Sequence, residues 1–412
     1  MKILWLSHFL LFPETGYGAL QRSRNLLLQL SKKNDVFLLS YYRDGDLKFS
    51  PDLDLAQKDL EKYCRRVVLV PSPLNGKNKY YKLSMILESV FSKTPYSVLL
   101  FRHKVFFEKA LQMIEEFSID LVHSDTLGLS EKFLGEKSTV KILNHHNIES
   151  HMMFRRAEKE GNILKKLFLA KEGWNLKNYE NTFCRQYDLN VVVSDIDKER
   201  LNGINRNIKS AVIENGVDCD YFSHHFRDQN CKGLIFTGSL DWYPNADAML
   251  YFCRQIWPLL RKRFNNLTLN IIGKNPPPEL LFLIKGEKGI FWEGFVSDVR
   301  EFIKKGRVFV CPIRDGGGTR LKILDALAQG IPVVSSTVGC EGIDVINGEN
   351  ILMADDVEDI VNKVSSLLMD EELCNKLSGN GRRLVEVKYS FDILGRKISD
   401  LYRGTQDRYG HG

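Results

Sequence analysis

The sequence predicts an α/β protein with two tandem Rossmann-like domains, each a doubly wound parallel sheet, and an interdomain cleft. Apolar runs of strand length alternate with amphipathic helical stretches through both halves of the chain. Strands that alternate with helices in this way form parallel sheets. A polar stretch interrupts the alternation near the middle, and 412 residues that are 43% apolar suffice for two hydrophobic cores.

The first alternating series opens with a buried strand, then a loop that contains Gly16 and Gly18, then a helix over Ala19–Leu30. The two glycines allow the loop to approach a phosphate or an acceptor closely. As a dinucleotide-binding fingerprint the loop is poor, because Gln21 stands where the third glycine belongs. The expected strands of this series are Lys2–Ser7, Val36–Tyr41, Arg66–Val70, Asp120–Ser124, Val140–Asn144 and Leu189–Val193.

A boundary is expected near Glu214–Asp218, which gives a first domain over residues 1–215, a second over 216–388 and a final segment over 389–412. The expected strands of the second series are Gly233–Thr237, Leu267–Ile272, Gly289–Trp292, Val308–Cys311 and Pro332–Ser335. The expected helices are Ala246–Arg263, Val299–Lys304, Thr319–Ala328, Val357–Met369, Glu371–Val387 and Phe391–Arg403.

Positive charge gathers in the first half of the chain. Residues 1–210 contain 33 Lys and Arg against 25 Asp and Glu, whereas the remainder contains 25 against 27. This asymmetry suggests an anionic partner such as a membrane surface or a phosphate-bearing acceptor, although a lysine-rich solvated surface explains it equally well. Between Tyr80 and Phe117 apolar residues are interleaved with lysines, which is typical of helices that cover a sheet or of a membrane-docking region. No nucleic-acid partner is expected.

The eight cysteines are scattered without a CxxC pair, which argues against a zinc site or a disulfide framework and for a reducing cytoplasm. No segment approaches the roughly 18 apolar residues of a membrane span. Met1–Phe12 reads as the first strand rather than as a signal peptide, since no small-residue cleavage site follows it.

The stretch Cys311–Ser335 combines a strand, three consecutive glycines, a helix and a second strand. A glycine loop at a helix N-terminus offers backbone N–H groups and the positive end of the helix dipole to an anion. Thr319 is expected to be the N-cap of that helix. Arg320 and Lys322 lie in the first turn, where the dipole disfavours cations, so a phosphate group is the expected ligand. The stretch does not fit the Walker A pattern.

Six blocks in order carry a family likeness: the glycine loop, NHHNIESHMMFRR, ENGVDCDYF, FTGSLDWYPNADA, FWEGFVSDVREF and VFVCPIRDGGGTRLKILDALAQGIPVVS. The chain resembles the group 1 glycosyltransferases (glycosyltransferase family 4) over nearly its whole length. The resemblance implies the GT-B fold and sugar transfer from a nucleotide-sugar with retention at the anomeric carbon. It also implies that the final helix crosses back onto the first, acceptor-binding domain.

For the donor site, the resemblance places Asp325 at the family Glu that bonds the ribose hydroxyls. A second family Glu, which contacts the donor sugar, is replaced here by Gly317, so Asp315 or the backbone N–H groups of Gly316–Gly318 are the alternatives. Many relatives also have Gly-Arg where this chain has Gly238-Ser239, and a Lys several residues on. We therefore expect Arg320 and Lys322 to bind the diphosphate instead. The backbone around Phe295 and Val296 is expected to contact the base.

In NHHNIES an expected strand runs into a histidine pair, and the family carries a histidine at this strand end that faces the donor sugar. His146, followed by Asn147, matches that position best, with His145 as the alternative. The carboxyl end of a strand in a doubly wound sheet is where ligands bind. Glu149 is either an acceptor-side base or a helix-start carboxylate.

The sequence therefore predicts a retaining, metal-independent glycosyltransferase without a cofactor, active in a bacterial-type cytoplasm or on the inner face of the membrane. His146, Arg320 and Lys322 are the expected catalytic residues; a UDP- or GDP-sugar is the expected donor and a glycan or lipid-linked molecule the acceptor. A non-catalytic nucleotide-binding partner subunit and a nucleotide-sugar epimerase are the alternatives, and a dinucleotide oxidoreductase is disfavoured by the broken glycine fingerprint.

Overall fold

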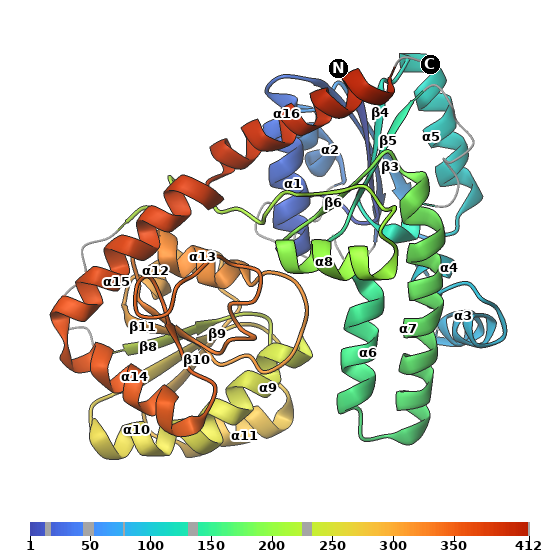
Figure 1. The fold of residues 1–412 in the computed structure, drawn as a ribbon. Coiled ribbons are helices and arrows are strands. Elements are labelled where there is room, and N and C mark those ends of the chain that lie inside the picture. The colour runs from blue at the N-terminus through green and yellow to red at the C-terminus, as the bar shows by residue number, and fades with distance from the viewer. Residues whose placement is uncertain (13–17, 44–52, 77–78, 131–138, 225–232, 411–412) are drawn as a thin grey trace. The chain divides into compact units, whose positions relative to one another are not determined.

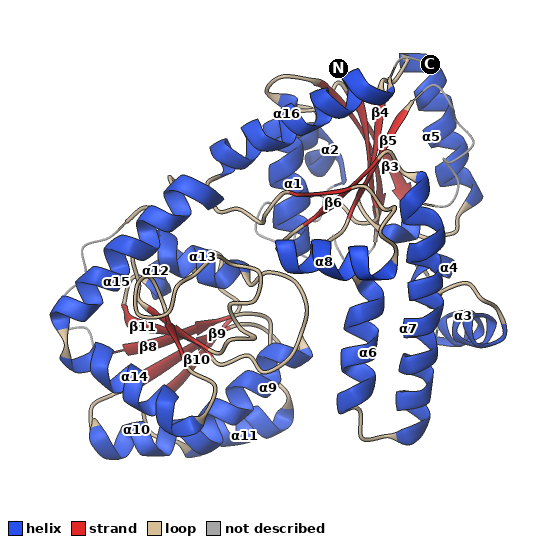
Figure 2. Cartoon of the chain, in the orientation of Figure 1, coloured by secondary structure: helices blue, strands red, loops and turns tan. Residues whose placement is uncertain are grey.

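The computed structural model describes residues 1–12, 18–43, 53–76, 79–130, 139–224 and 233–410. The chain divides into two compact units, one formed by Met1–Glu214 with Leu394–Gly412 and the other by Asn215–Ile393. The expected boundaries, before residue 216 and before residue 389, fall one and five residues from these divisions. Each unit contains a parallel sheet with helices on its faces (Figure 1; Figure 2), so the predicted fold class is confirmed.

The sheet of the first domain has seven strands in the order β3-β2-β1-β4-β5-β6-β7, and every neighbouring pair is parallel. The strands are β1 (Lys2–Ser7), β2 (Asp35–Tyr42), β3 (Arg66–Pro71), β4 (Leu121–Ser124), β5 (Val140–Asn144), β6 (Leu189–Val192) and β7 (Ser210–Val212). The first six are the predicted strands to within two residues at each end. Strand β7, a three-residue strand at the edge of the sheet, was not predicted.

Residues of β1 alternate between two layers of helices, as the two-residue period of a strand requires. Ile3 and Trp5 pack in the core with α1 (Gly18–Ser31), α2 (Leu53–Leu60) and α16 (Phe391–Tyr409). Leu4 and Leu6 pack in a second core with α5 (Lys104–Phe117). The remaining helices of this domain are α3 (Lys79–Phe91), α4 (Tyr96–Leu99), α6 (Glu149–Lys159), α7 (Ile163–Phe183) and α8 (Asp195–Ile204). A strand covered on both faces must be apolar throughout, which explains why the β1 sequence is a continuous hydrophobic run.

The sheet of the second domain has six strands in the order β10-β9-β8-β11-β12-β13. The strands are β8 (Gly233–Thr237), β9 (Thr268–Ile272), β10 (Ile290–Gly294), β11 (Gly306–Cys311), β12 (Val333–Ser335) and β13 (Leu352–Met353). The helices are α9 (Tyr243–Tyr251), α10 (Trp257–Arg263), α11 (Pro278–Gly286), α12 (Arg300–Ile303), α13 (Leu321–Ala328), α14 (Val357–Met369) and α15 (Glu371–Leu384). Helix α11 and strand β13 were not predicted.

The expected helix Ala246–Arg263 lies within a helical stretch that runs from Tyr243 to Arg263 without a gap. Residues Phe252–Ile256 within it form a π-helical turn between α9 and α10. Pro258 explains this turn, because it has no amide N–H to donate and its ring excludes the carbonyl one turn earlier. No helix within the described ranges is both long and apolar enough to cross a membrane.

Candidate functional site

The loop between β11 and α13 needs its glycines. Gly316 and Gly318 have φ angles of 117° and 72°, a region that residues with a Cβ rarely occupy. A Cβ on Gly316 would also lie 3.0 Å from Nη2 of Arg320. Asp315 is 2% exposed, and its Oδ1 accepts a hydrogen bond of 2.7 Å from the backbone N–H of Gly316. Asp315 thus supports the loop from inside. The contact of the donor sugar with Asp315 or with the N–H groups of Gly316–Gly318 stays a prediction.

The N-cap of helix α13 lies one residue later than predicted. Arg320, not Thr319, is the N-cap, and no side chain caps the helix. The prediction for Thr319 was therefore wrong, because the glycine loop carries the chain one residue further before it turns helical. The buried Oγ1 of Thr319 has no hydrogen-bond partner among the described residues. A helix N-terminus without a cap, next to an unpaired hydroxyl, has donors that a ligand can satisfy.

Arg320 and Lys322, the two predicted cations, make different contacts at the start of α13. Nη1 of Arg320 donates to the carbonyl oxygens of Gly317 and Gly318 and so clamps the loop. Nζ of Lys322 donates to Oδ1 of Asn245 at 2.7 Å and lies 4.2 Å from the centroid of the Phe236 ring. Burial lowers the pKa of Lys322 to about 8, and the nearby charge of Arg320 adds to this effect. An anion bound beside this lysine would favour its charged form.

Asp325 lies on the same helix as Lys322, three residues further on, as predicted. Burial raises the pKa of Asp325 to about 7, and the charge of Lys322 opposes the rise. A buried carboxyl group with a perturbed pKa beside a lysine is typical of functional sites. Its predicted role toward the ribose remains a prediction.

Gly238 and Ser239, which were predicted to bind the donor, lie close to Lys322 and to its partner Asn245. Gly238, which follows β8, has φ of 146°, and a Cβ there would approach Nζ of Lys322 to 2.3 Å. Nδ2 of Asn245 donates to the carbonyl oxygen of Ser239 at 2.8 Å, while its Oδ1 accepts from Lys322. Asn245 was not predicted, although its block FTGSLDWYPNADA was singled out. Val296, by contrast, packs against the apolar core of the domain, and the predicted contact with a base remains a prediction.

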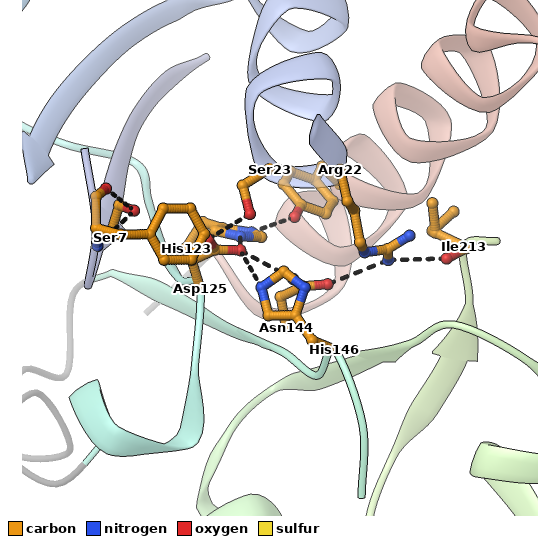
Figure 3. Close-up of polar contacts among 10 residues, drawn as sticks. Ser7, Arg22, Ser23, His123, Asp125, Asn144, His146 and Ile213 are labelled. Atoms are coloured by element: carbon orange, nitrogen blue, oxygen red, sulfur yellow. Dashed lines mark hydrogen bonds and ion pairs between the residues drawn. The ribbon is translucent and has the colours of Figure 1, made fainter. Parts of the chain in front are cut away.

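A second candidate site lies at the carboxyl ends of β4 and β5 in the first domain (Figure 3). Its centre is the fully buried Asp125. Nδ2 of Asn144 donates to Oδ1 of Asp125 at 2.9 Å, and Oγ of Ser23 donates to Oδ2 at 2.6 Å. Nε2 of His146 lies 3.4 Å from Oδ1, and the His146 side chain is 15% exposed. His146 is thus the member of the group that reaches the surface.

Asp125 is a buried carboxylate that stays ionised. Burial alone would raise its pKa, but charge interactions and hydrogen bonds with His146 and His123 outweigh burial and hold the pKa well below the usual carboxyl range. Burial lowers the pKa of His123, which stacks on Trp5 at 3.6 Å between ring centroids and hydrogen-bonds Tyr402 through Nδ1. Tyr402 belongs to α16, so the last helix contributes to this site.

Arg22 of α1 holds the other side of the network. Its guanidinium donates to Oδ1 of Asn144 at 3.2 Å and to the carbonyl oxygens of Ile213 and Glu214 at 2.8 Å each. Burial lowers the pKa of Arg22 to about 10. The Glu214 carboxylate in turn pairs with Lys397 of α16 at 2.7 Å.

The two histidines of the NHHNIES block differ in their surroundings. His145 is 3% exposed, its Nε2 lies 3.0 Å from Oδ1 of Asn190, and burial lowers its pKa to about 4. His145 is therefore inside the domain, which favours His146 as the functional residue. The buried Oδ1 of Asn147 has no hydrogen-bond partner within the described residues.

Of the two roles weighed for Glu149, the structure supports the helix-start role, since Glu149 is the first residue of α6. Oγ of Ser97 donates to its Oε2 at 3.2 Å, and burial raises its pKa. Gly16 lies outside the described residues, and Gly18 is the first residue of α1, so neither is seen next to His146.

Sequence reasoning missed Asp125, Asn144, Arg22 and Ser23. The available signal was positional, because Asp125 directly follows a predicted strand and Asn144 ends the next. No signal pointed to Arg22 and Ser23, which come from a helix. In the described part of the chain, no three His, Cys, Asp or Glu side chains are grouped so as to hold a metal ion.

Residues 231–370 match the family model described as "Glycosyl transferases group 1". An uncharacterized 44.6 kDa protein in the cps region of Klebsiella pneumoniae is 24% identical over 372 residues, which cover 86% of this chain and 88% of that protein. The capsular polysaccharide biosynthesis glycosyltransferase CapM of Staphylococcus aureus is 33% identical over 109 residues, or 26% of this chain and 28% of that protein.

Solved structures agree with the fold over the whole chain. Sucrose-phosphate synthase from Thermosynechococcus elongatus has a TM-score of 0.73 at 14% identity, covering 99% of this chain and 100% of that one. HepE of Anabaena, crystallised with UDP-glucose, has a TM-score of 0.66 at 15% identity, covering 98% and 100%. Likeness at this level of identity shows the fold.

Proposed function

We propose a specific activity for this chain, whose second domain belongs to the group 1 glycosyltransferases by its match over residues 231–370 and whose two domains have the GT-B fold. It is a glycosyltransferase that moves a sugar from a nucleotide-diphosphate-sugar to a hydroxyl of an acceptor, with retention at the anomeric carbon. The acceptor is a glycan or lipid-linked precursor of a bacterial surface polysaccharide or glycolipid.

The observation that carries this proposal is the cluster of Arg320, Lys322 and the Gly316–Gly318 loop at the uncapped start of α13. When the bond between sugar and diphosphate breaks, negative charge develops on the leaving diphosphate. Two preorganised cations and the N–H groups of a helix start stabilise that charge most where it is largest, in the transition state. The same groups support a reaction that proceeds without a metal ion. Asp325 would accept hydrogen bonds from the ribose.

The first domain supplies His146. Nε2 of that imidazole lies 3.4 Å from Oδ1 of Asp125, which leaves Nδ1 for a ligand. The Asp125 carboxylate orients the ring. His146 would hydrogen-bond the donor sugar or the acceptor, while Ser23, Asn144 and Arg22 keep Asp125 in place.

The comparisons support the class of donor and the pathway. The structures of HepE contain UDP and UDP-glucose, and CapM is by its name a capsular polysaccharide glycosyltransferase. We therefore place UDP first among the nucleotides to test and GDP second. Such an acceptor would be met in the cytoplasm, at the inner face of the membrane.

The decisive experiment is a thermal-shift screen of the full chain against UDP, GDP, ADP and their sugars, followed by a transfer assay with the donor that stabilises most. Stabilisation by one nucleotide and release of that nucleotide in the presence of acceptor are expected. The absence of stabilisation by any of them would overturn the proposal.

One observation favours a second candidate, a nucleotide-binding partner subunit without activity, because Gly317 replaces a family Glu. That protein would be stabilised by a nucleotide but would neither hydrolyse nor transfer the sugar in the presence of acceptor. A nucleotide-sugar epimerase would convert the donor without an acceptor, which chromatography of the sugar would reveal.

A further inference from the structure

Helix α3 (Lys79–Phe91) exposes a stripe of apolar side chains. Tyr80, Leu83, Leu87 and Phe91 are each at least half exposed, and Phe91 is 87% exposed. Their spacing of three, four and four residues places them on one face of the helix.

The opposite face of α3 is the one that attaches it to the domain. Ser89, half a helical turn away from the stripe, is buried. Its carbonyl oxygen accepts hydrogen bonds from Nζ of Lys171 at 2.8 Å and from Nδ2 of Asn175 at 3.3 Å, both on α7. The attachment of α3 thus leaves the stripe facing outward, and core packing does not account for its composition.

The first residues of the neighbouring α7 also expose apolar side chains. Ile163, Leu164 and Leu167 are all more than half exposed, and Leu164 is 76% exposed. These residues follow the turn that joins α6 and α7, where the hairpin projects from the sheet (Figure 1). Together with the stripe on α3 they form a set that we call the docking face: Tyr80, Leu83, Leu87, Phe91, Ile163, Leu164 and Leu167.

Basic residues surround the docking face. Lys82 and Lys166 are exposed beside its apolar side chains, as is Lys165, which pairs with Glu160. Residues 79–93 and 149–177 together contain ten Lys and Arg but five Asp and Glu, of which Glu172 is buried. Lysine is depleted in protein–protein interfaces, whereas apolar side chains mixed with lysine suit a bilayer with anionic headgroups.

We propose that the docking face binds the surface of an anionic lipid bilayer, with its apolar side chains at the headgroup boundary and its lysines on the lipid phosphates. The proposal rests on the proposed function in one respect, since a lipid-linked acceptor would be presented at such a surface. It adds the residues that make the contact.

The test is co-sedimentation of the full chain with vesicles, without donor or acceptor. Vesicles of phosphatidylcholine alone are compared with vesicles that also contain phosphatidylglycerol. The chain is expected to bind the anionic vesicles, more weakly as salt rises. The triple variant Leu83→Ser/Leu87→Ser/Phe91→Ser should bind about tenfold more weakly or worse, and Lys82→Ala/Lys166→Ala should reduce both binding and its salt dependence.

The matched control is Phe282→Ser/Met369→Ser/Val387→Ser, which removes three side chains of comparable exposure from the second domain. This variant should bind vesicles as the parent does. Thermal melting with and without UDP checks that every variant folds and keeps its nucleotide site. A loss of vesicle binding with an intact UDP response separates this proposal from the proposed function.

Three results would overturn the proposal: no binding of the parent to anionic vesicles, equal binding to neutral ones, or unchanged binding of the α3 triple variant. If the docking face instead joins two copies of the chain, sedimentation velocity will show a dimer that the triple variant abolishes, and vesicle binding will be absent.

Discussion

The glycine loop of the second domain is built from residues close together in the chain, whereas the Asp125 network of the first domain draws on β1, α1, β4, β5 and α16. The loop site places cations at a helix start that no side chain caps, and its main contributor from outside the loop is Asn245. The network surrounds a buried anion and leaves only His146 near the surface. One domain is thus arranged to receive negative charge, and the other holds a fixed negative charge behind an imidazole. Substitutions in the two sites should therefore affect different steps.

The largest expected effect is that of His146→Ala on turnover. Removal of a group that acts on the reacting sugar should lower kcat by about 10²- to 10⁴-fold. The thermal shift produced by the nucleotide should stay unchanged, because the proposed nucleotide site is in the other domain. His145→Gln is the control; it should lower the melting temperature while the folded protein keeps its turnover. If His146→Ala retains full kcat, the imidazole has no catalytic role.

Lys322→Ala should have the next largest effect and, unlike His146→Ala, should change nucleotide binding as well as turnover. Loss of a charge at the leaving diphosphate should lower kcat by about 10²-fold and also weaken nucleotide binding in calorimetry. Arg320→Ala should act in the same direction. Arg314→Ala is the matched control, since Arg314 lies just before the loop but pairs with Asp247 at 2.7 Å. Nucleotide affinity that is unchanged in Arg320→Ala would show that the diphosphate does not depend on the helix-start cations.

Asp125→Asn should lower the stability of the first domain. The substitution leaves Ser23 and Asn144 facing an amide in place of a carboxylate that accepts from both. Loss of charge-assisted hydrogen bonds in a buried site should cost about 2–3 kcal/mol of unfolding free energy, measured by urea denaturation. Asp195→Asn, at the first residue of α8, is the control and should change little. Stability equal to that of the parent would mean that the network does not depend on the charge of Asp125.

The smallest expected effect is the uptake of a proton when the nucleotide binds. Lys322 has its pKa lowered to about 8 in the unliganded protein, and a bound diphosphate would raise it again. Binding above pH 8 should therefore take up a proton, and affinity should fall as the pH rises beyond 8. Calorimetry at pH 8.5 in two buffers of different ionisation enthalpy measures this uptake. Lys322→Arg should bind without it; uptake that persists in that variant would assign the proton to another group.

Sequence reasoning predicted more of the glycine-loop site than of the Asp125 network. Residues close together in the chain form the first, whereas residues far apart in the chain form the second. Local patterns predicted both sheets, the glycine loop and the pairing of Lys322 with Asp325 on one helix. They failed for β7 and β13, which are too short to show a period, and for the N-cap at Thr319, which depends on how far the loop runs. Arg22 and Tyr402 could not be predicted, because only the tertiary fold brings them to Asp125 and His123.

Helix α16 follows the second domain in the chain, and this affects when the first domain can complete its core during synthesis. Tyr402 and Ile398 are fully buried in the core of the first domain, and Tyr402 bonds His123 beside Asp125. A ribosome that has synthesised only residues 1–214 has produced a first domain without these side chains. The whole second domain must be translated before they emerge. The first domain therefore completes its core, and secures the support of His146, only after the second domain has been synthesised.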